Sequence, residues 1–69
     1  MLTEVIQFNG KAIEDFDGRA LTELLSANRY KTALIAVEYN GAILPKDQYD
    51  KTILKDGDTL EVVSFVGGG

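Results

Sequence analysis

The residues with the clearest chemical potential in this sequence are its last three, Gly67, Gly68 and Gly69, which follow a β-branched and aromatic stretch. Glycine within a loop usually supplies a backbone conformation that other residues avoid, but no residues follow here that need such a bend. We therefore expect residues 67–69 to form a slim, flexible arm that carries an ionised carboxylate on Gly69. That carboxylate is the predicted reactive group.

The composition argues against most other chemistry. The 69 residues include no cysteine, histidine or tryptophan, which excludes thiol catalysis, imidazole acid–base chemistry and the usual Cys/His metal sites. The acidic residues are scattered and lack the spacing of an EF-hand, and the sequence has no glycine-rich phosphate-binding motif. We expect a protein that is not an enzyme and that holds no metal or cofactor of its own.

Length and charge narrow the class of partner. A chain of 69 residues with 45% hydrophobic residues indicates one small globular domain. The net charge of −4 and the dispersion of the seven basic residues argue against nucleic acid and favour an acidic surface that binds protein partners. The longest apolar run, Ala33 to Val37, is too short to cross a membrane, so we expect a cytoplasmic protein with no membrane partner.

Two Asn-Gly pairs predict tight β-hairpins, because both central residues of a type I′ turn need positive φ. With Asn9-Gly10 as the first turn, Ile6 pairs with Ile13 and both lie on the core face. Asn40-Gly41 predicts a second hairpin, which joins a strand expected to be buried on both sides to a short strand that ends before a proline.

Leucines 21, 24 and 25 follow the i, i+3, i+4 spacing of a short amphipathic helix over residues 20–28. Its start is poorly marked, with Asp17 or Gly18 as the candidate cap. Further along, a polar segment carries Tyr49, which we expect to form a lid over the edge of the core.

A last strand is predicted from residue 59 to residue 66. Its alternation places Leu60 and Val62 toward the core and turns Val63 and Phe65 to the opposite face. The nearby acidic side chains are expected to be solvated and able to complement a basic partner surface; they are Asp56, Asp58 and Glu61.

Strands on both sides of one helix indicate an α+β fold with a mixed four- to five-stranded sheet and the helix packed across one face. The first and last strands are expected to lie side by side in the centre and to run parallel. Residues 1–66 would form this single domain, with the arm at 67–69.

Several motifs in this order resemble a known family. The helix sequence Leu21-Thr22-Glu23-Leu24-Leu25, an apolar strand running into Asn-Gly, the Asp56-Gly57-Asp58 turn and the ending Phe65-Val66-Gly67-Gly68-Gly69 are similar to the ThiS-type sulfur carriers of thiamine biosynthesis. The resemblance covers essentially the whole chain. It implies a ubiquitin-like β-grasp fold, in agreement with the architecture expected from the residue pattern.

The resemblance also implies a chemistry. An E1-like adenylating enzyme would use ATP and magnesium to adenylate the Gly69 carboxylate, and sulfur derived from cysteine by a desulfurase would convert it to a thiocarboxylate. Thiazole synthase would then receive this covalently carried sulfur. Gly67 and Gly68 would form the arm, and the candidate partner-binding residues beside it are Val63, Phe65 and Val66.

Three alternatives remain open at this stage. The small subunit of molybdopterin synthase shares the fold, the Gly-Gly end and the thiocarboxylate, although it is usually longer and often has a proline before the tail. A ubiquitin-like modifier would use the same activated glycine, but this tail lacks the basic residues of ubiquitin. A non-catalytic β-grasp interaction module with an inert tail is the third.

Overall fold

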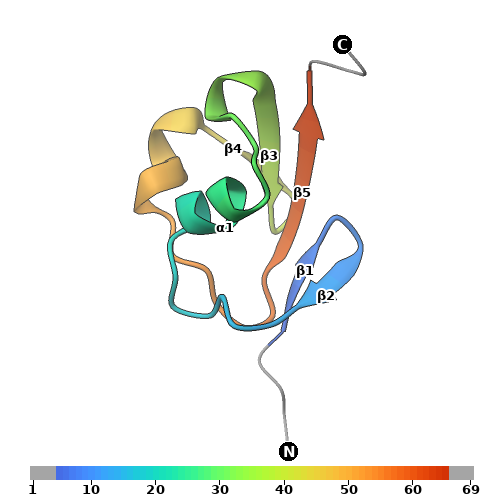
Figure 1. The fold of residues 1–69 in the computed structure, drawn as a ribbon. Coiled ribbons are helices and arrows are strands. Elements are labelled where there is room, and N and C mark those ends of the chain that lie inside the picture. The colour runs from blue at the N-terminus through green and yellow to red at the C-terminus, as the bar shows by residue number, and fades with distance from the viewer. Residues whose placement is uncertain (1–4, 66–69) are drawn as a thin grey trace, which may run out of the picture.

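The fold is a five-stranded mixed sheet with one α-helix across one face (Figure 1). A computed structural model describes residues 5–65, so the candidate residues Val66, Gly67, Gly68 and Gly69 lie outside the described part. The elements are β1 (Ile6–Phe8), β2 (Lys11–Ile13), α1 (Leu21–Ala27), the 3-10 helix η1 (Thr32–Leu34), β3 (Ile35–Tyr39), β4 (Ala42–Leu44), the 3-10 helix η2 (Lys46–Lys51) and β5 (Thr59–Ser64). The strand order is β2-β1-β5-β3-β4. The predicted α+β class and the parallel central pair of β1 and β5 are confirmed.

Both Asn-Gly turns form as predicted. Asn9 and Gly10 have φ values of 51° and 82°, and the second pair, Asn40-Gly41, has values of 52° and 88°. The first turn pairs Ile6 with Ile13, which is the register expected from the sequence. Positive φ is easy for glycine and tolerable for asparagine, so each pair sets the register of its hairpin.

The predicted leucine stripe buries α1 against the sheet, with Leu21, Leu24 and Leu25 all at most 2% exposed. The predicted caps, Asp17 and Gly18, are wrong, because the helix begins after Ala20 without any side-chain cap. The backbone N–H of Leu21 instead donates to the Thr52 carbonyl at 2.9 Å. A segment about thirty residues away in sequence therefore satisfies the start of the helix.

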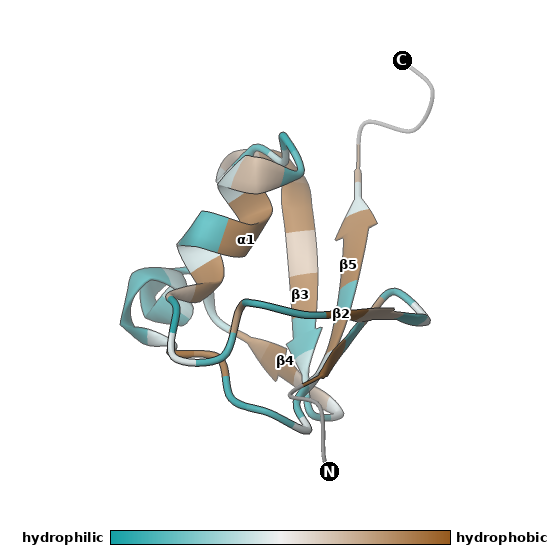
Figure 2. Cartoon of the chain, turned by 60° about the horizontal axis from the view of Figure 1, so that its bottom comes forward, coloured by the Kyte–Doolittle hydropathy of each residue, from teal (hydrophilic) through white to brown (hydrophobic). Residues whose placement is uncertain are grey.

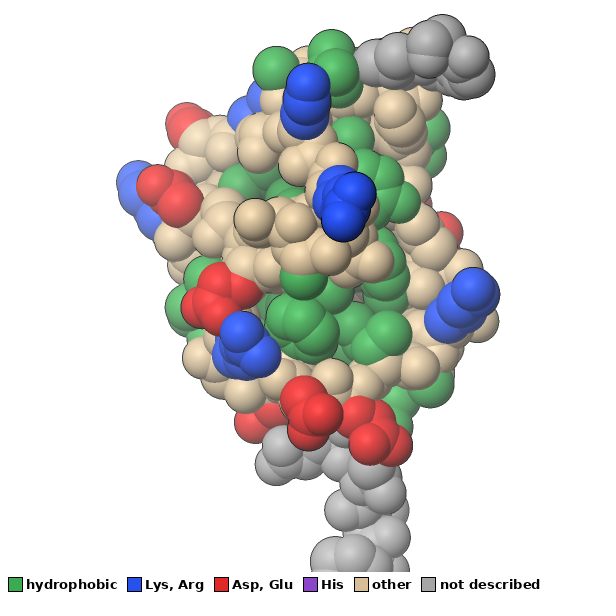
Figure 3. All heavy atoms as spheres, viewed as in Figure 1, with side chains coloured by type: hydrophobic (Ala, Val, Ile, Leu, Met, Phe, Trp, Pro, Cys, Tyr) green, Lys and Arg blue, Asp and Glu red, His purple; other side chains and the backbone are tan. Residues whose placement is uncertain are grey.

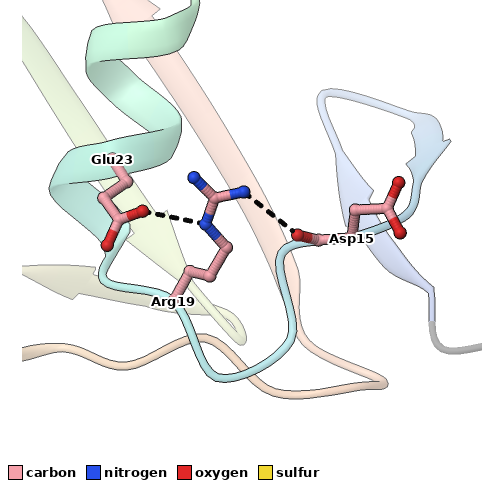
Figure 4. A network of polar contacts seen from close by, with 3 residues as sticks. All are labelled: Asp15, Arg19 and Glu23. Atoms are coloured by element: carbon pink, nitrogen blue, oxygen red, sulfur yellow. Dashed lines mark hydrogen bonds and ion pairs between the residues drawn. The ribbon is translucent and has the colours of Figure 1, made fainter.

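Arg19 ties the connection before α1 to the first turn of the helix (Figure 4). Its Nε donates to Glu23 Oε1 at 2.8 Å, and its Nη1 donates to the backbone carbonyl of Asp15 at 3.4 Å. The guanidinium also lies 4.8 Å from the centre of the Phe16 ring. Both charged side chains are about half exposed, so this pair contributes little stability and mainly orders the loop.

The core lies between α1, η2 and one face of the sheet. Its buried side chains are Ile6, Phe8, Leu21, Leu24, Leu25, Ile35, Val37, Tyr49, Leu54, Leu60 and Val62. In Figure 2 the strands are mostly brown and the connections mostly teal, as this partition of apolar and polar residues requires.

Two expectations about burial are corrected. Tyr49 is 2% exposed and belongs to the core itself, because η2 turns its ring inward beside α1. The strand preceding the second turn is buried on one side only: Ile35 and Val37 face the core, whereas Glu38 is exposed on the other face. No element within residues 5–65 covers that outer face. Buried side chains therefore alternate with more exposed ones along β3, as in a strand that has one face toward solvent.

Candidate functional site

The candidate site begins where β5 leaves the sheet. β5 pairs with β1 on one side and β3 on the other, which holds the strand in the centre of the sheet. Val63 and Phe65 are 59% and 65% exposed, on the face predicted from the alternation of the strand. β5 ends at Ser64, and Phe65 is the last residue that the structure describes. The predicted arm therefore begins next to a strand that is held on both sides by its neighbours in the sheet.

Asn9 determines where the pairing between β1 and β5 stops. Its backbone N–H donates to the Leu60 carbonyl at 2.9 Å, while its side-chain Oδ1 accepts a hydrogen bond from the backbone N–H of Val62 at 2.7 Å. Its Nδ2 reaches the Tyr30 hydroxyl at 3.4 Å. The turn residue thus replaces one further step of the β1–β5 ladder, a role that the Asn-Gly signal alone does not reveal.

Lys46 contacts the segments next to Phe65 and lies close to the Phe65 ring. Its ammonium donates to the carbonyls of Thr32 and Ile35 at 2.8 and 2.6 Å, at the junction of η1 with β3. The same Nζ lies 5.9 Å from the ring centres of both Tyr49 and Phe65. The Phe65 N–H donates to the Leu34 carbonyl at 2.7 Å, so backbone and ring are both positioned. Sequence reasoning missed Lys46, because its partners are backbone atoms distant along the chain.

A groove of about 230 Å³ opens beside this point, and its lining is mostly apolar. Ile43, Leu44, Pro45, Tyr49 and Phe65 contribute to its walls. Ile43 of this groove is 68% exposed, and the exposed side chain of Val63 adds to the apolar surface next to the end of β5. We call the set Ile43, Val63 and Phe65 the apolar patch. Small domains seldom expose such side chains together unless a partner covers them.

Asp58 corrects the expectation that the acidic residues of the last turn are solvated. It is 4% exposed and accepts hydrogen bonds from Tyr39 Oη at 2.6 Å, Asn40 Nδ2 at 3.1 Å and the Lys55 N–H at 2.8 Å. Burial raises the pKa of Asp58, but these hydrogen bonds outweigh burial and hold the pKa below its usual range. Burial, and then the hydrogen bond to Asp58, raises the pKa of Tyr39 to about 12. The group locks the last turn to the second hairpin.

Neither a cluster of potential metal ligands nor a membrane-spanning helix occurs among the described residues. Within residues 5–65 no three acidic side chains converge so that they could hold a metal ion. The helices of this part of the chain are all too short and too polar to span a bilayer. On the face shown in Figure 3, Lys and Arg side chains lie apart from one another, so that face presents no continuous basic strip to a phosphate backbone.

The sheet order, the single helix and an exposed patch beside the last strand define the class of protein, a ubiquitin-like β-grasp domain. A crystal structure of the thiamine biosynthesis protein ThiS from Geobacter metallireducens superposes with a TM-score of 0.74 at 39% identity, covering 94% of this chain and 99% of that one. The profile of the ThiS family matches residues 2–69. The chain belongs to the ThiS family.

Two curated relatives differ in how they carry the similar region. The sulfur carrier protein ThiS of Bacillus subtilis is 35% identical over 66 residues, which is 94% of this chain and 100% of that protein. A thiazole synthase of Magnetococcus marinus is 34% identical over 64 residues, which is 93% of this chain but 20% of that enzyme. The similar region thus occurs both as a separate small protein and as part of a larger enzyme.

Proposed function

We propose that this protein is a sulfur carrier in thiamine biosynthesis that delivers sulfur as a thiocarboxylate on Gly69. The observation that carries the proposal is similarity along the whole length of a protein named as a ThiS sulfur carrier. The same similarity favours this function over the molybdopterin synthase subunit, the protein modifier and the inert interaction module. The protein acts as a co-substrate of its partner enzymes and not as a catalyst.

The proposed chemistry activates a poor electrophile. A Gly69 carboxylate oxygen attacks the α-phosphorus of ATP and releases pyrophosphate, which forms a mixed anhydride with AMP. A sulfur nucleophile on the partner side, derived from cysteine by a desulfurase, then attacks the acyl carbon, and AMP leaves with the C–O bond electrons. This nucleophile is the terminal sulfur of a partner persulfide, so its attack gives an acyl disulfide. A second thiolate of the partner then attacks the inner sulfur of that S–S bond and forms a disulfide with it, and the thiocarboxylate leaves with the electrons of the S–S bond. The chain has no cysteine, so it cannot hold the sulfur as a persulfide of its own.

The adenylating enzyme supplies the nucleotide site, ATP and magnesium in this scheme. Four extended residues from Val66 to Gly69 reach at most about 14 Å. That length takes the carboxylate into a partner's nucleotide site while the folded body stays outside. Gly67 and Gly68 keep the thread narrow, since any side chain would widen it and restrict its backbone.

The folded body supplies a rigid base and a docking surface. β1 and β3 hold β5 from both sides, and Lys46 and the Leu34 carbonyl fix Phe65. The apolar patch lies beside that point, and we propose that partners contact it, with Val66 continuing the contact along the arm. Thiazole synthase is the proposed sulfur acceptor, supported by the carrier-like region within synthase relatives. We place the exchange in the cytoplasm.

Deletion of Gly69 tests the proposal. In a strain that lacks its own carrier, the full-length chain is expected to restore growth without thiamine. The chain lacking Gly69 is expected to fail, although its circular dichroism and thermal unfolding match those of the full-length protein. Growth restored by the shortened chain would contradict a role for the terminal carboxylate.

A further inference from the structure

Two glutamate residues lie directly opposite each other on the outer face of the sheet. Glu38 of β3 is in register with Glu61 of β5. Backbone hydrogen bonds join Asn40 to Thr59 and Phe65 to Leu34 across β3 and β5. In an antiparallel pair of strands every second opposed pair is hydrogen-bonded, so Glu38 and Glu61 also form a hydrogen-bonded pair. Their Cβ atoms are therefore about 5.5 Å apart, close enough for the carboxylates to repel each other.

No ion pair within residues 5–65 brings a basic side chain to either carboxylate. The ion pair in this part of the chain is Arg19 with Glu23, on the connection into α1, and neither Glu38 nor Glu61 has one. Lys46, the basic residue beside the apolar patch, donates hydrogen bonds to the carbonyls of Thr32 and Ile35 instead. Like charges placed opposite each other weaken a sheet, so we expect this pair to lower the stability of the free protein.

Apolar side chains border the two carboxylates. Ile43 is in register with Glu38 on the other side of β3, and Val63 follows Glu61 on the same face of β5. Ile43 and Val63 are both more than half exposed. The surface therefore combines a concentrated negative charge with hydrophobic flanks. A long basic side chain matches it, because its aliphatic stem packs on apolar groups while its cationic head meets the carboxylates.

We propose that the outer face of the sheet docks thiazole synthase by accepting one arginine of the enzyme between Glu38 and Glu61. A guanidinium carries five donors in a planar fork and can bridge two carboxylates, which a single ammonium does less well. Binding would remove the repulsion that the free protein tolerates. This inference rests on the proposed function for the identity of the partner, and the synthase relatives that contain a carrier-like region support that choice.

Glu38→Gln and Glu61→Gln test the inference, with Glu14→Gln as the matched control, since Glu14 is exposed and lies beyond the end of β2. Titration calorimetry with purified thiazole synthase from the same organism measures the dissociation constant. Each of the first two variants is expected to bind about five- to tenfold more weakly, and the control as tightly as wild type. The difference should shrink as salt is raised. Both variants should unfold at the same or a higher temperature than wild type, which separates lost docking from lost folding.

Formation of the thiocarboxylate by the adenylating enzyme is measured on the same proteins and reports the proposed function separately. Wild-type binding by both variants would overturn the docking inference and leave the sulfur carrier function intact. Weakened binding to the adenylating enzyme alone, or binding to the synthase that requires added Mg²⁺ or Ca²⁺, would also overturn it. Failure of the wild-type chain to form any thiocarboxylate would instead overturn the proposed function.

Discussion

Replacing Asp58 should destabilise this protein more than replacing any exposed acidic residue. Asp58 is 4% exposed and accepts three hydrogen bonds, from Tyr39, Asn40 and the Lys55 N–H. Hydrogen bonds to a charged group are worth about 1.5–3 kcal/mol each. Water can replace the acceptor for the exposed Asn40, so two bonds dominate, and we expect Asp58→Ala to lower the free energy of unfolding by about 3 kcal/mol.

That loss is large for a chain of this size. Stabilities of about 0.05–0.15 kcal/mol per residue place the whole domain at roughly 3–10 kcal/mol. A loss of 1 kcal/mol lowers the melting temperature of such a domain by about 4–8 °C, so Asp58→Ala should melt roughly 12–24 °C below wild type. Thermal and urea unfolding followed by circular dichroism measure both quantities. Asp50→Asn is the control, because Asp50 is exposed on η2.

The pH dependence tests the electrostatic cause. The folded state holds the pKa of Asp58 below its value in the unfolded chain, so the charge contributes stability that is complete above the unfolded pKa of about 3.9. This contribution is lost as pH falls through the folded pKa. The stability difference between wild type and Asp58→Asn should therefore be constant from pH 7 to about pH 5 and shrink below about pH 4. An Asp58→Asn protein as stable as wild type at pH 7, or a difference that persists in acid, would refute this reasoning.

Three further substitutions separate the arm, the patch and the fold. Gly68→Trp should leave the melting temperature unchanged but block activation of the carboxylate, because a bulky side chain no longer threads into the nucleotide site; normal ATP–pyrophosphate exchange with the adenylating enzyme would contradict this. Phe65→Ala should weaken partner binding about tenfold while lowering the melting temperature by only a few degrees, since the ring is 65% exposed; unchanged affinity in titration calorimetry would remove Phe65 from the interface. Asn9→Gly keeps the positive φ of the turn but deletes the acceptor for the Val62 N–H, so urea unfolding should show a loss of about 1–2 kcal/mol, and an unchanged midpoint would show that water replaces the side chain.

Local patterns were enough to predict most of the fold. The Asn-Gly pairs determine two hairpins and their registers, and the leucine spacing determines the buried face of α1. The alternation along β5 also places Val63 and Phe65 on the exposed face. Each of these sequence signals lies within a few residues of the structure that it specifies, so the structure can be predicted from the local sequence.

The features that were missed depend on contacts between distant segments. The burial of Asp58 follows from its approach to Tyr39 and Asn40, and the start of α1 is satisfied by the Thr52 carbonyl. Lys46 bonds to carbonyls eleven and fourteen residues earlier. No spacing rule predicts such contacts, because their members lie far apart in the sequence. They become visible only when the sheet brings the segments together.

The central claim is that sulfur travels on the Gly69 carboxylate. Intact-mass spectrometry of the protein, incubated with its adenylating enzyme, ATP, magnesium, a cysteine desulfurase and cysteine, measures this most directly. The account predicts a species heavier by the difference between one sulfur and one oxygen atom, located by fragmentation at Gly69 and lost when thiazole synthase and its substrates are added. A protein that keeps its unmodified mass under these conditions, with an adenylating enzyme shown to be active, would contradict it.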